Sequence, residues 1–101
     1  MSPTILTNPR RAAINKICTD NQITYLALFG SHARGDNTAT SDIDLLVEFS
    51  AKKSLFDLMR LQNQFEQTFG MKVDLVPRHS VKPALKAYID QDVSPIYNAE
   101  R

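Results

Sequence analysis

The segment ITYLALF, which covers residues 23–29, places the strongest constraint on the fold. It is rich in residues that favour β-structure and is almost wholly apolar, so it lacks the alternation of a strand with one face in water. Gly30 follows it directly and ends the run. We therefore expect a strand that is covered on both faces, which requires a sheet with helices packed against it.

The remaining segments supply the helices and the other strands of such a layered fold. Asn8 fits an N-cap before Pro9, Ser54 and Pro83 open two further helical segments, and Gly70 fits a left-handed position after a helix. The predicted elements are helices over residues 9–21, 31–34, 55–69 and 83–92, strands over 23–29, 43–49 and 72–76, and an irregular tail. This order predicts an α/β fold of the α+β kind, with a small mixed β-sheet and helices packed on it.

Composition restricts the class of protein. A chain of 101 residues that is 43% hydrophobic fits a single domain over residues 1–101. Its formal net charge of +1 does not suit the dense basic stripe that a nucleic-acid backbone requires, so direct nucleic-acid binding is not expected. The longest apolar run, Tyr25 to Phe29, is far short of a membrane span, and Cys18 reads as a buried structural thiol. We expect a cytoplasmic protein without membrane contact.

Asp42 and Asp44 stand two residues apart at the start of the strand predicted over residues 43–49. Side chains at this spacing leave the same face of a strand, so the two carboxylates project together while Ile43 points into the core. Two acidic residues on a solvated strand face are common, so this pair indicates a site only together with other signals.

Asp74 is the second signal, because it stands between Val73 and Leu75 in a short strand of interior character. An acidic residue in such a strand is expected to be paired or to bind a metal ion. If this strand lies beside that of Asp44, three carboxylates converge, and each pair at about 4 Å would repel by up to roughly 4 kcal/mol at an effective dielectric of 20. We therefore expect a compensating cation, and ligands that are all oxygen select Mg²⁺ or Mn²⁺ over zinc.

Gly30, Ser31 and Arg34 form the third signal, where the first strand runs into a short helix. Gly30 lets the backbone approach a ligand closely, Ser31 offers a hydroxyl group, and Arg34 lies three residues later on the same helical face. The N–H groups of a helix start favour an anion, and a planar guanidinium group suits phosphate oxygens. We expect these three residues to bind the phosphates of a nucleotide.

Other polar residues near these signals are assigned structural positions. Asp36 and Ser41 fit the turn before the second strand, where side chains of their type bond nearby backbone N–H groups. His32 and His79 have no spaced cysteine or histidine partners for zinc, so surface positions are expected for both.

The string GSHARGDNTATSDIDLLV over residues 30–47, followed by VDLV at residues 73–76, resembles the signature of the DNA polymerase β nucleotidyltransferase superfamily. The glycine and serine, the arginine, the paired aspartates and the third aspartate on its own strand occur in the family's order. More narrowly, the GSxARGDxxxxSDIDL pattern is similar to that of the minimal nucleotidyltransferase (MNT) antitoxins, which are encoded beside HEPN-domain toxins in toxin–antitoxin pairs.

The resemblance implies a polymerase-β-like palm fold and a transfer of AMP from ATP to a hydroxyl group. The acceptor would be a tyrosine of a HEPN ribonuclease toxin, which the transfer would silence, and the two proteins would form a stable hetero-oligomer. By the same resemblance, Asp42 and Asp44 bind two Mg²⁺ ions, and Asp74 ligates the catalytic ion and helps to deprotonate the attacking hydroxyl. The three phosphate-binding residues would then hold the β- and γ-phosphates.

Two other functions stay open at this point. One is an antitoxin that neutralises its partner by binding alone, although three mutually repulsive carboxylates have no physical purpose in such a protein. The other is a nucleotidyltransferase that acts on a small molecule such as an aminoglycoside. A glycosyltransferase with an Asp-x-Asp motif would need a longer chain, and neither the EF-hand spacing nor the Gly-Lys of a P-loop occurs.

Overall fold

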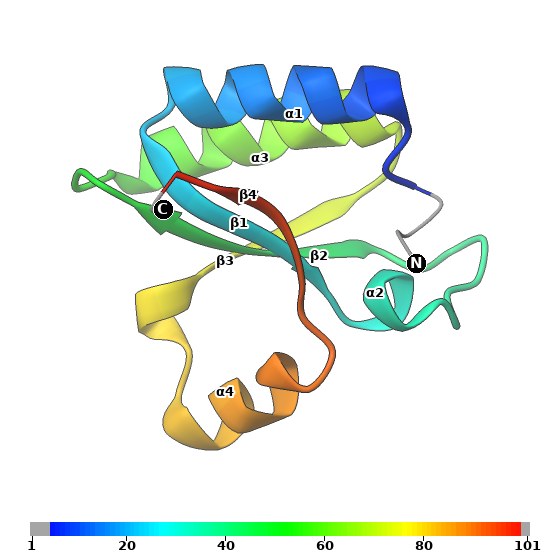
Figure 1. The fold of residues 1–101 in the computed structure, drawn as a ribbon. Coiled ribbons are helices and arrows are strands. Elements are labelled where there is room, and N and C mark those ends of the chain that lie inside the picture. Colours follow the sequence, from blue (N-terminus) through cyan, green and yellow to red (C-terminus); the bar gives the residue numbers. More distant parts are fainter. Residues whose placement is uncertain (1–4, 100–101) are drawn as a thin grey trace.

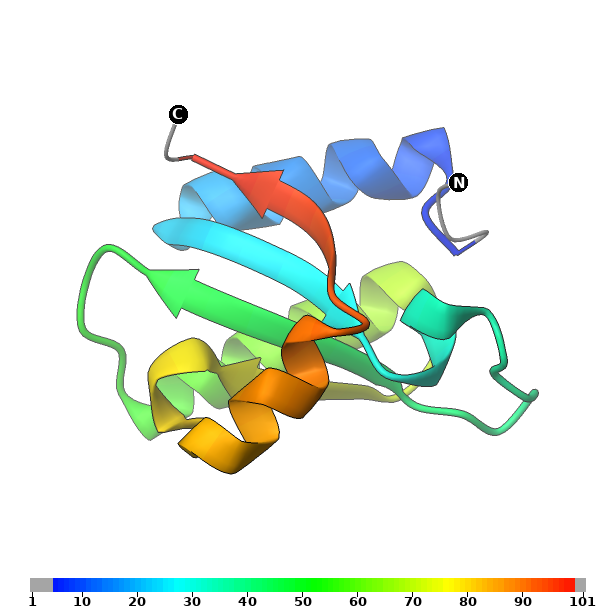
Figure 2. The ribbon, with the colours of Figure 1, turned by 60° about the horizontal axis from the view of Figure 1, so that its bottom comes forward.

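The computed structural model describes residues 5–99. Its elements in chain order are α1 Asn8–Asp20, β1 Ile23–Phe29, α2 Ser31–Arg34, β2 Ile43–Phe49, α3 Leu55–Phe69, β3 Val73–Pro77, the 3₁₀ helix η1 Arg78–Ser80, α4 Pro83–Asp90 and β4 Ser94–Asn98. The strands form one mixed sheet in the order β3-β2-β1-β4, in which β2 and β3 are parallel and the other neighbours are antiparallel. Figure 1 shows α1 and α3 over one face of this sheet and α4 below the other, and Figure 2 brings α4 forward. The predicted fold class is confirmed.

The hydrophobic core has one part on each face of the sheet. The larger part lies under α1 and α3 and includes Leu26 of β1 and Leu45 of β2. The smaller part lies under α4 and consists of Ala27, Leu46 and Ile89 with partly buried neighbours. Successive residues of β1 and β2 thus enter opposite parts of the core, which explains why the run over residues 23–29 is almost continuously apolar.

Both long helices begin at side-chain caps. The hydroxyl of Thr7, rather than the side chain of Asn8, accepts a hydrogen bond from the backbone N–H three residues later, so α1 begins one residue earlier than predicted. The helix also ends one residue earlier than predicted. Ser54 and Asp57 form a capping box at the start of α3, and Gly70 follows the helix with a φ of 73°. The predicted cap of α3 and its terminating glycine are confirmed.

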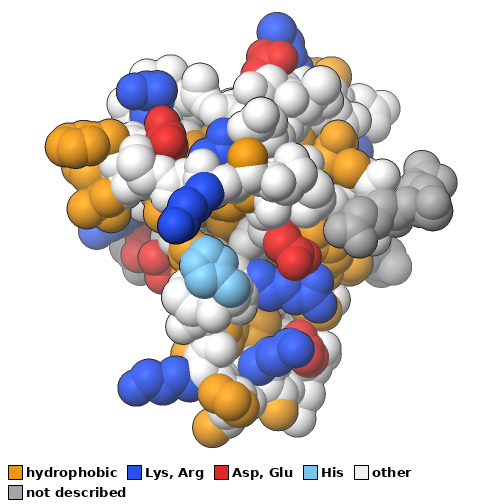
Figure 3. All heavy atoms as spheres, turned by 90° about the vertical axis from the view of Figure 1, so that its left-hand side faces the viewer, with side chains coloured by type: hydrophobic (Ala, Val, Ile, Leu, Met, Phe, Trp, Pro, Cys, Tyr) orange, Lys and Arg blue, Asp and Glu red, His pale blue; other side chains and the backbone are white. Residues whose placement is uncertain are grey.

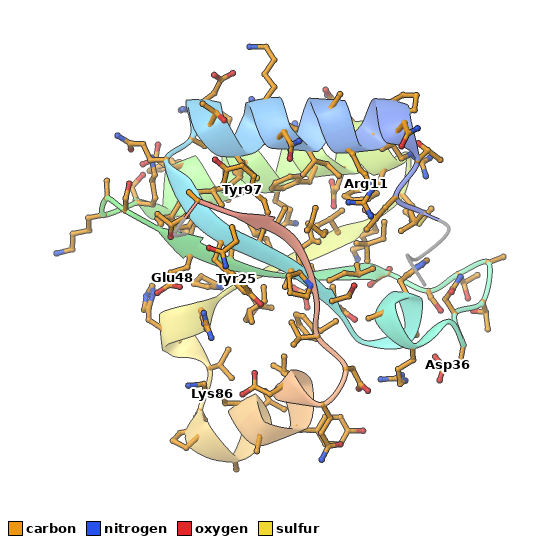
Figure 4. The ribbon with its side chains drawn as sticks, in the orientation of Figure 1. Arg11, Tyr25, Asp36, Glu48, Lys86 and Tyr97 are labelled. Carbon is orange, nitrogen blue, oxygen red and sulfur yellow. The ribbon has the colours of Figure 1, made fainter. Side chains whose placement is uncertain are left out.

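The segment after α4 differs from the prediction of an irregular tail. The helix ends at Asp90, two residues earlier than predicted, and Ser94–Asn98 forms β4 at the edge of the sheet beside β1. Pro95 has no N–H to donate, which an edge strand tolerates, and the pairing register of β4 shifts beside it. Tyr97 packs against the larger part of the core and is labelled in Figure 4. Pairing with a distant strand, rather than a local pattern, therefore makes this segment a strand.

The connection from β3 to α4 is held against the sheet by Arg78 of η1. Its guanidinium lies 4.8 Å from the centroid of the Tyr25 ring, and one of its nitrogens lies 3.3 Å from a carboxylate oxygen of Glu48. Figure 4 shows Tyr25 and Glu48 close together on the side of the sheet that α4 covers. These contacts fix the start of the segment that leads to α4.

Three properties that the sequence analysis considered can be checked in the structure: the burial of Cys18, the character of the helices and the distribution of charged side chains. Cys18 is fully buried, as predicted, and burial raises the pKa of its thiol to about 12. Within residues 5–99, no helix combines the length and apolar character that crossing a bilayer would require. On the face drawn in Figure 3, Lys and Arg side chains are separated by acidic and hydrophobic ones instead of forming a stripe.

Candidate active site

Asp44 and Asp74 face each other across neighbouring parallel strands. They are register partners in the β2–β3 pair. Their strand neighbours Ile43 and Val73 point into the larger part of the core, so the alternation of β-strands places both carboxylates on the face that α4 covers. Asp42 precedes β2 by one residue, and its charge acts on Asp44. The structure therefore brings the three predicted acidic residues near one another, with Asp44 and Asp74 on one face of the sheet.

One expectation about Asp74 is wrong. The sequence indicated an interior strand, whereas β3 is an edge strand of the sheet, and the Asp74 side chain is exposed. The apolar residues on either side of it, Val73 and Leu75, serve the core under α3 and leave the opposite face open. Exposure of Asp74 leaves it accessible to a ligand from solvent.

The pKa of Asp44 reflects both its partial burial and the negative charges beside it. Its pKa is raised above the ordinary value, first by partial burial, then by the neighbouring charges of Asp74 and Asp42, while His32 and Arg34 act in the opposite direction. Both other predicted acidic residues thus lie within electrostatic range of Asp44. An additional positive charge near this carboxylate would favour its ionised form.

The three carboxylates do not yet form a closed ligand set. Among residues 5–99, no three His, Cys, Asp or Glu side chains are gathered closely enough to hold a metal ion. Asp42 and Asp74 are exposed, and exposed side chains change rotamer within nanoseconds. The donors are all carboxylate oxygens, the type that Mg²⁺ and Mn²⁺ prefer, so the residues fit such an ion in chemistry and in excess negative charge.

Gly30 joins the turn that was predicted to bind phosphates to the carboxylates. It ends β1 with φ 76° and ψ −155°, a backbone conformation that is almost restricted to glycine. A Cβ atom at this position would collide with the carboxylate oxygen Oδ2 of Asp44. Ser31 follows at the start of α2 and is half-buried. The turn and the acidic face are therefore in direct contact, as the sequence pattern required.

Arg34 is held by two carboxylates at the other end of α2. Its Nε donates to Asp36 and its Nη1 donates to Asp92, each at 3.0 Å, and these hydrogen bonds raise the pKa of the guanidinium. Asp36, which was assigned to the turn alone, thus bonds Arg34, and Figure 4 shows Asp36 beside α2. Sequence reasoning missed Asp92 altogether, because 58 residues separate it from Arg34 and no local pattern marks it.

His32 is the second correction. It was expected at the surface, but its side chain is buried, and its Nε2 lies 3.2 Å from the backbone oxygen of Ser41. The Ser41 hydroxyl accepts a hydrogen bond from the N–H of Thr38, so the turn role predicted for Ser41 is confirmed. His32 therefore ties α2 to the residue that immediately precedes Asp42. His79 is exposed, as predicted.

A cavity of about 250 Å³ adjoins this site between α4 and the sheet. Gly30, Arg34 and Asp74 lie on its wall together with apolar residues of β1, β3 and α4. A larger groove of about 510 Å³ lies near the end of β2, around Phe49 and Lys53, and shares no residue with the smaller cavity. The smaller cavity is therefore the one that belongs to the predicted site.

Known proteins are similar to this chain in sequence and in fold. Residues 12–101 match the family described as polymerase beta, nucleotidyltransferase. A Methanocaldococcus jannaschii protein that is named as a protein adenylyltransferase is 40% identical over 79 residues, which is 78% of this chain and 85% of that protein.

Two solved structures extend the likeness to three dimensions. One, described as a minimal nucleotidyltransferase, is 33% identical with a TM-score of 0.75 and covers 86% of this chain and 89% of its own. The other is a complex of a tri-AMPylated Shewanella oneidensis HEPN toxin with an MNT antitoxin, with a TM-score of 0.70 at 20% identity, over 92% of this chain and 73% of that one, and shows the shared fold alone. On the family match and the 40% identity, this chain belongs to the polymerase β nucleotidyltransferase family.

Proposed function

We propose that this protein transfers AMP from ATP to a tyrosine hydroxyl of a HEPN-domain toxin and thereby neutralises the toxin. The observation that carries the proposal is the contact of Gly30 with Asp44, which stands in register with Asp74. It unites a turn suited to phosphates with carboxylates suited to a cation. A relative that is 40% identical is named as a protein adenylyltransferase, which supports transfer to a protein. The complex of an AMPylated HEPN toxin with an MNT antitoxin supports the kind of partner.

Two Mg²⁺ ions are part of the proposal, and Asp42, Asp44 and Asp74 would hold them. The raised pKa of Asp44, which has Asp74 and Asp42 as neighbours, supports a need for positive charge at this place. When bound, the ions supply positive charge that offsets the negative charge developing on the transferred phosphoryl group.

The residues of the chain then act on ATP and on the acceptor. Gly30, Ser31 and Arg34 bind the β- and γ-phosphates and stabilise the pyrophosphate that leaves. The tyrosine oxygen attacks the α-phosphorus, and the bond breaks between this phosphorus and the oxygen that joins it to the β-phosphorus. The phenolic proton passes to Asp74. The partner must present its tyrosine in line with that bond, so a stable complex of the two proteins favours the reaction.

The direct test mixes the protein with its HEPN partner, ATP and Mg²⁺ and measures the intact mass of the partner. We expect one or more AMP-sized increments that map to a tyrosine. Asp44→Asn, which removes a carboxylate from the centre of the acidic face, should abolish the increments, and chelation of Mg²⁺ should do the same.

The same variants separate catalysis from neutralisation by binding. If Asp44→Asn forms the complex normally but no longer protects cells from the toxin, neutralisation depends on transfer. Full protection by this variant, or an unmodified partner after reaction with the unaltered protein, would contradict the proposal. Exposed Asp20 provides the matched control, because Asp20→Asn removes an acidic group from α1, which lies on the face of the sheet opposite the site (Figure 1).

A further inference from the structure

The cavity under α4 is lined by residues of two chemical kinds. The apolar residues of its wall are Phe29 of β1, Val76 of β3, and Leu85, Tyr88 and Ile89 of α4. These residues offer aliphatic and aromatic surface on two sides, from the sheet and from the helix. Such walls suit a flat, largely apolar ring.

The other residues of the cavity wall belong to the proposed catalytic centre or contact it. Gly30, Arg34 and Asp74 lie there, with Asp92, whose carboxylate holds Arg34 at 3.0 Å. The wall of the cavity therefore combines the proposed phosphate-binding turn with hydrophobic side chains. A nucleoside triphosphate likewise combines charged phosphates with a flat, largely apolar base.

The α4 side chains on the cavity wall differ in how much of their surface is exposed to solvent. Ile89 is 5% exposed and anchors α4 to the sheet, whereas Leu85 and Tyr88, at positions three residues apart on the helix, are 53% and 63% exposed. Figure 3 shows hydrophobic side chains at the bottom of the molecule, where α4 lies. Large apolar side chains that remain exposed beside a polar site commonly mark a binding surface.

We infer that this cavity is the nucleobase subsite of the enzyme, in which Leu85 and Tyr88 of α4 cover the adenine ring of ATP against Phe29 and Val76. The inference rests on the proposed function and extends it to residues outside the sequence motif. Recognition is by stacking and apolar contact. The aromatic ring of Tyr88, rather than its hydroxyl, provides the contact.

The adenine ring fits this cavity better than the ring of the acceptor tyrosine does. An in-line reaction requires the acceptor to approach from the side opposite the leaving pyrophosphate, and thus away from Gly30 and Arg34. The cavity instead includes these two residues in its wall. Its volume of about 250 Å³ lies below the roughly 300–1,000 Å³ of sites that enclose whole ligands, which suits one part of a nucleotide.

The test compares two probes in the presence of Mg²⁺ by titration calorimetry: the non-hydrolysable analogue AMP-PNP, and inorganic tripolyphosphate, which has no base. We expect the double variant Leu85→Ala/Tyr88→Ala to bind AMP-PNP about tenfold more weakly, or about 1.4 kcal/mol, which is within the range for losing an aromatic platform under a base. Its affinity for tripolyphosphate should not change. Tyr88→Phe should bind both probes as the unaltered protein does.

Phe56→Ala is the matched control, because Phe56 is 75% exposed on α3, away from the cavity, and its loss should affect neither probe. Thermal melting checks that each variant is folded. Unchanged AMP-PNP affinity in the double variant would overturn the subsite, and a raised KM for the HEPN partner alone would assign the cavity to the acceptor instead. Failure of the unaltered protein to bind AMP-PNP would overturn the proposed function as well. Tight AMP-PNP binding without any AMP transfer would overturn the proposed function and leave the subsite in place.

Discussion

The carboxylate of Asp44 occupies the space beside Gly30 that any side chain at position 30 would need. The turn that we propose to bind phosphates and the acidic face are therefore in direct contact, so a side chain added at position 30 would displace Asp44. This relationship gives the sharpest test of the site.

Gly30→Ala should damage both the fold and the activity. The added Cβ collides with Asp44, and the φ of 76° with ψ of −155° strains a residue other than glycine, so we expect a loss of about 1–3 kcal/mol in the free energy of unfolding, with AMP transfer abolished. Urea denaturation and the mass assay measure the two effects. Gly70→Ala is the matched control: Gly70 also has a positive φ, but nothing lies within 4 Å of its added Cβ. It should lose about 1–2 kcal/mol of stability and retain transfer. Equal transfer by the two variants would contradict the contact.

Asp92→Asn should raise the KM for ATP several-fold while leaving the melting temperature nearly unchanged. Asp92 orients Arg34 through Nη1, and an ion pair with partly exposed side chains contributes little to stability. Steady-state kinetics over a range of ATP concentrations provide the measurement. Asp20→Asn breaks the exposed pair with Lys16 and should leave the KM unaltered. An Asp92→Asn enzyme with the KM of the unaltered protein would show that Arg34 needs no such support.

Asp44→Asn should stabilise the metal-free protein at pH 7. A carboxyl whose pKa is raised in the folded state makes its full contribution to the stability of the protein below its ordinary pKa of about 3.9. This contribution is lost as the pH rises through the higher folded pKa. Asparagine cannot ionise, so the variant avoids that loss. Melting curves at pH values from about 3 to about 7, which span that ordinary pKa of about 3.9, measure the effect. The melting temperature of the variant should exceed that of the unaltered protein by less as the pH falls. An advantage that is constant over this range would exclude the charge as its cause.

Mg²⁺ should reverse the order of stability of these two proteins. A cation that binds only the folded state raises the melting temperature, and the rise grows with the ratio of its concentration to its dissociation constant. Asp42, Asp44 and Asp74 together offer such a cation three carboxylates. We expect added Mg²⁺ to raise the melting temperature of the unaltered protein and to have little effect on Asp44→Asn. Equal shifts for both proteins would place the ion elsewhere.

Cys18 should be unreactive toward iodoacetamide at pH 8 until the protein unfolds. Burial raises the pKa of its thiol to about 12, and only the thiolate reacts. The buried neutral thiol keeps its full contribution to stability below the unfolded pKa of about 8.5, and that contribution is lost as the pH rises toward about 12. Mass spectrometry of the alkylated protein, with a urea-unfolded sample as control, measures the protection. Rapid alkylation of the folded protein would show that the α1 layer opens readily.

Local patterns in the sequence predicted most of the elements and the composition of the site. Alternation about Ile43 placed Asp42 and Asp44 on one face, Ser54 marked the start of α3, and the apolar run before Gly30 indicated a strand covered on both sides. Each of these inferences depends on residues within one helical turn or a few strand positions of one another. Such relationships survive any arrangement of the elements, and the sequence alone therefore determined them.

Only the tertiary structure decided which distant residues meet. The parallel register of Asp44 with Asp74, the hold of Asp92 on Arg34 and the burial of His32 under the loop at Ser41 arise from how the strands and α4 assemble. The same holds for β4, which is a strand because β1 offers it an edge to pair with. The residues next to each partner in the sequence do not predict these contacts, because the contacts join groups that the chain brings together only when it is folded.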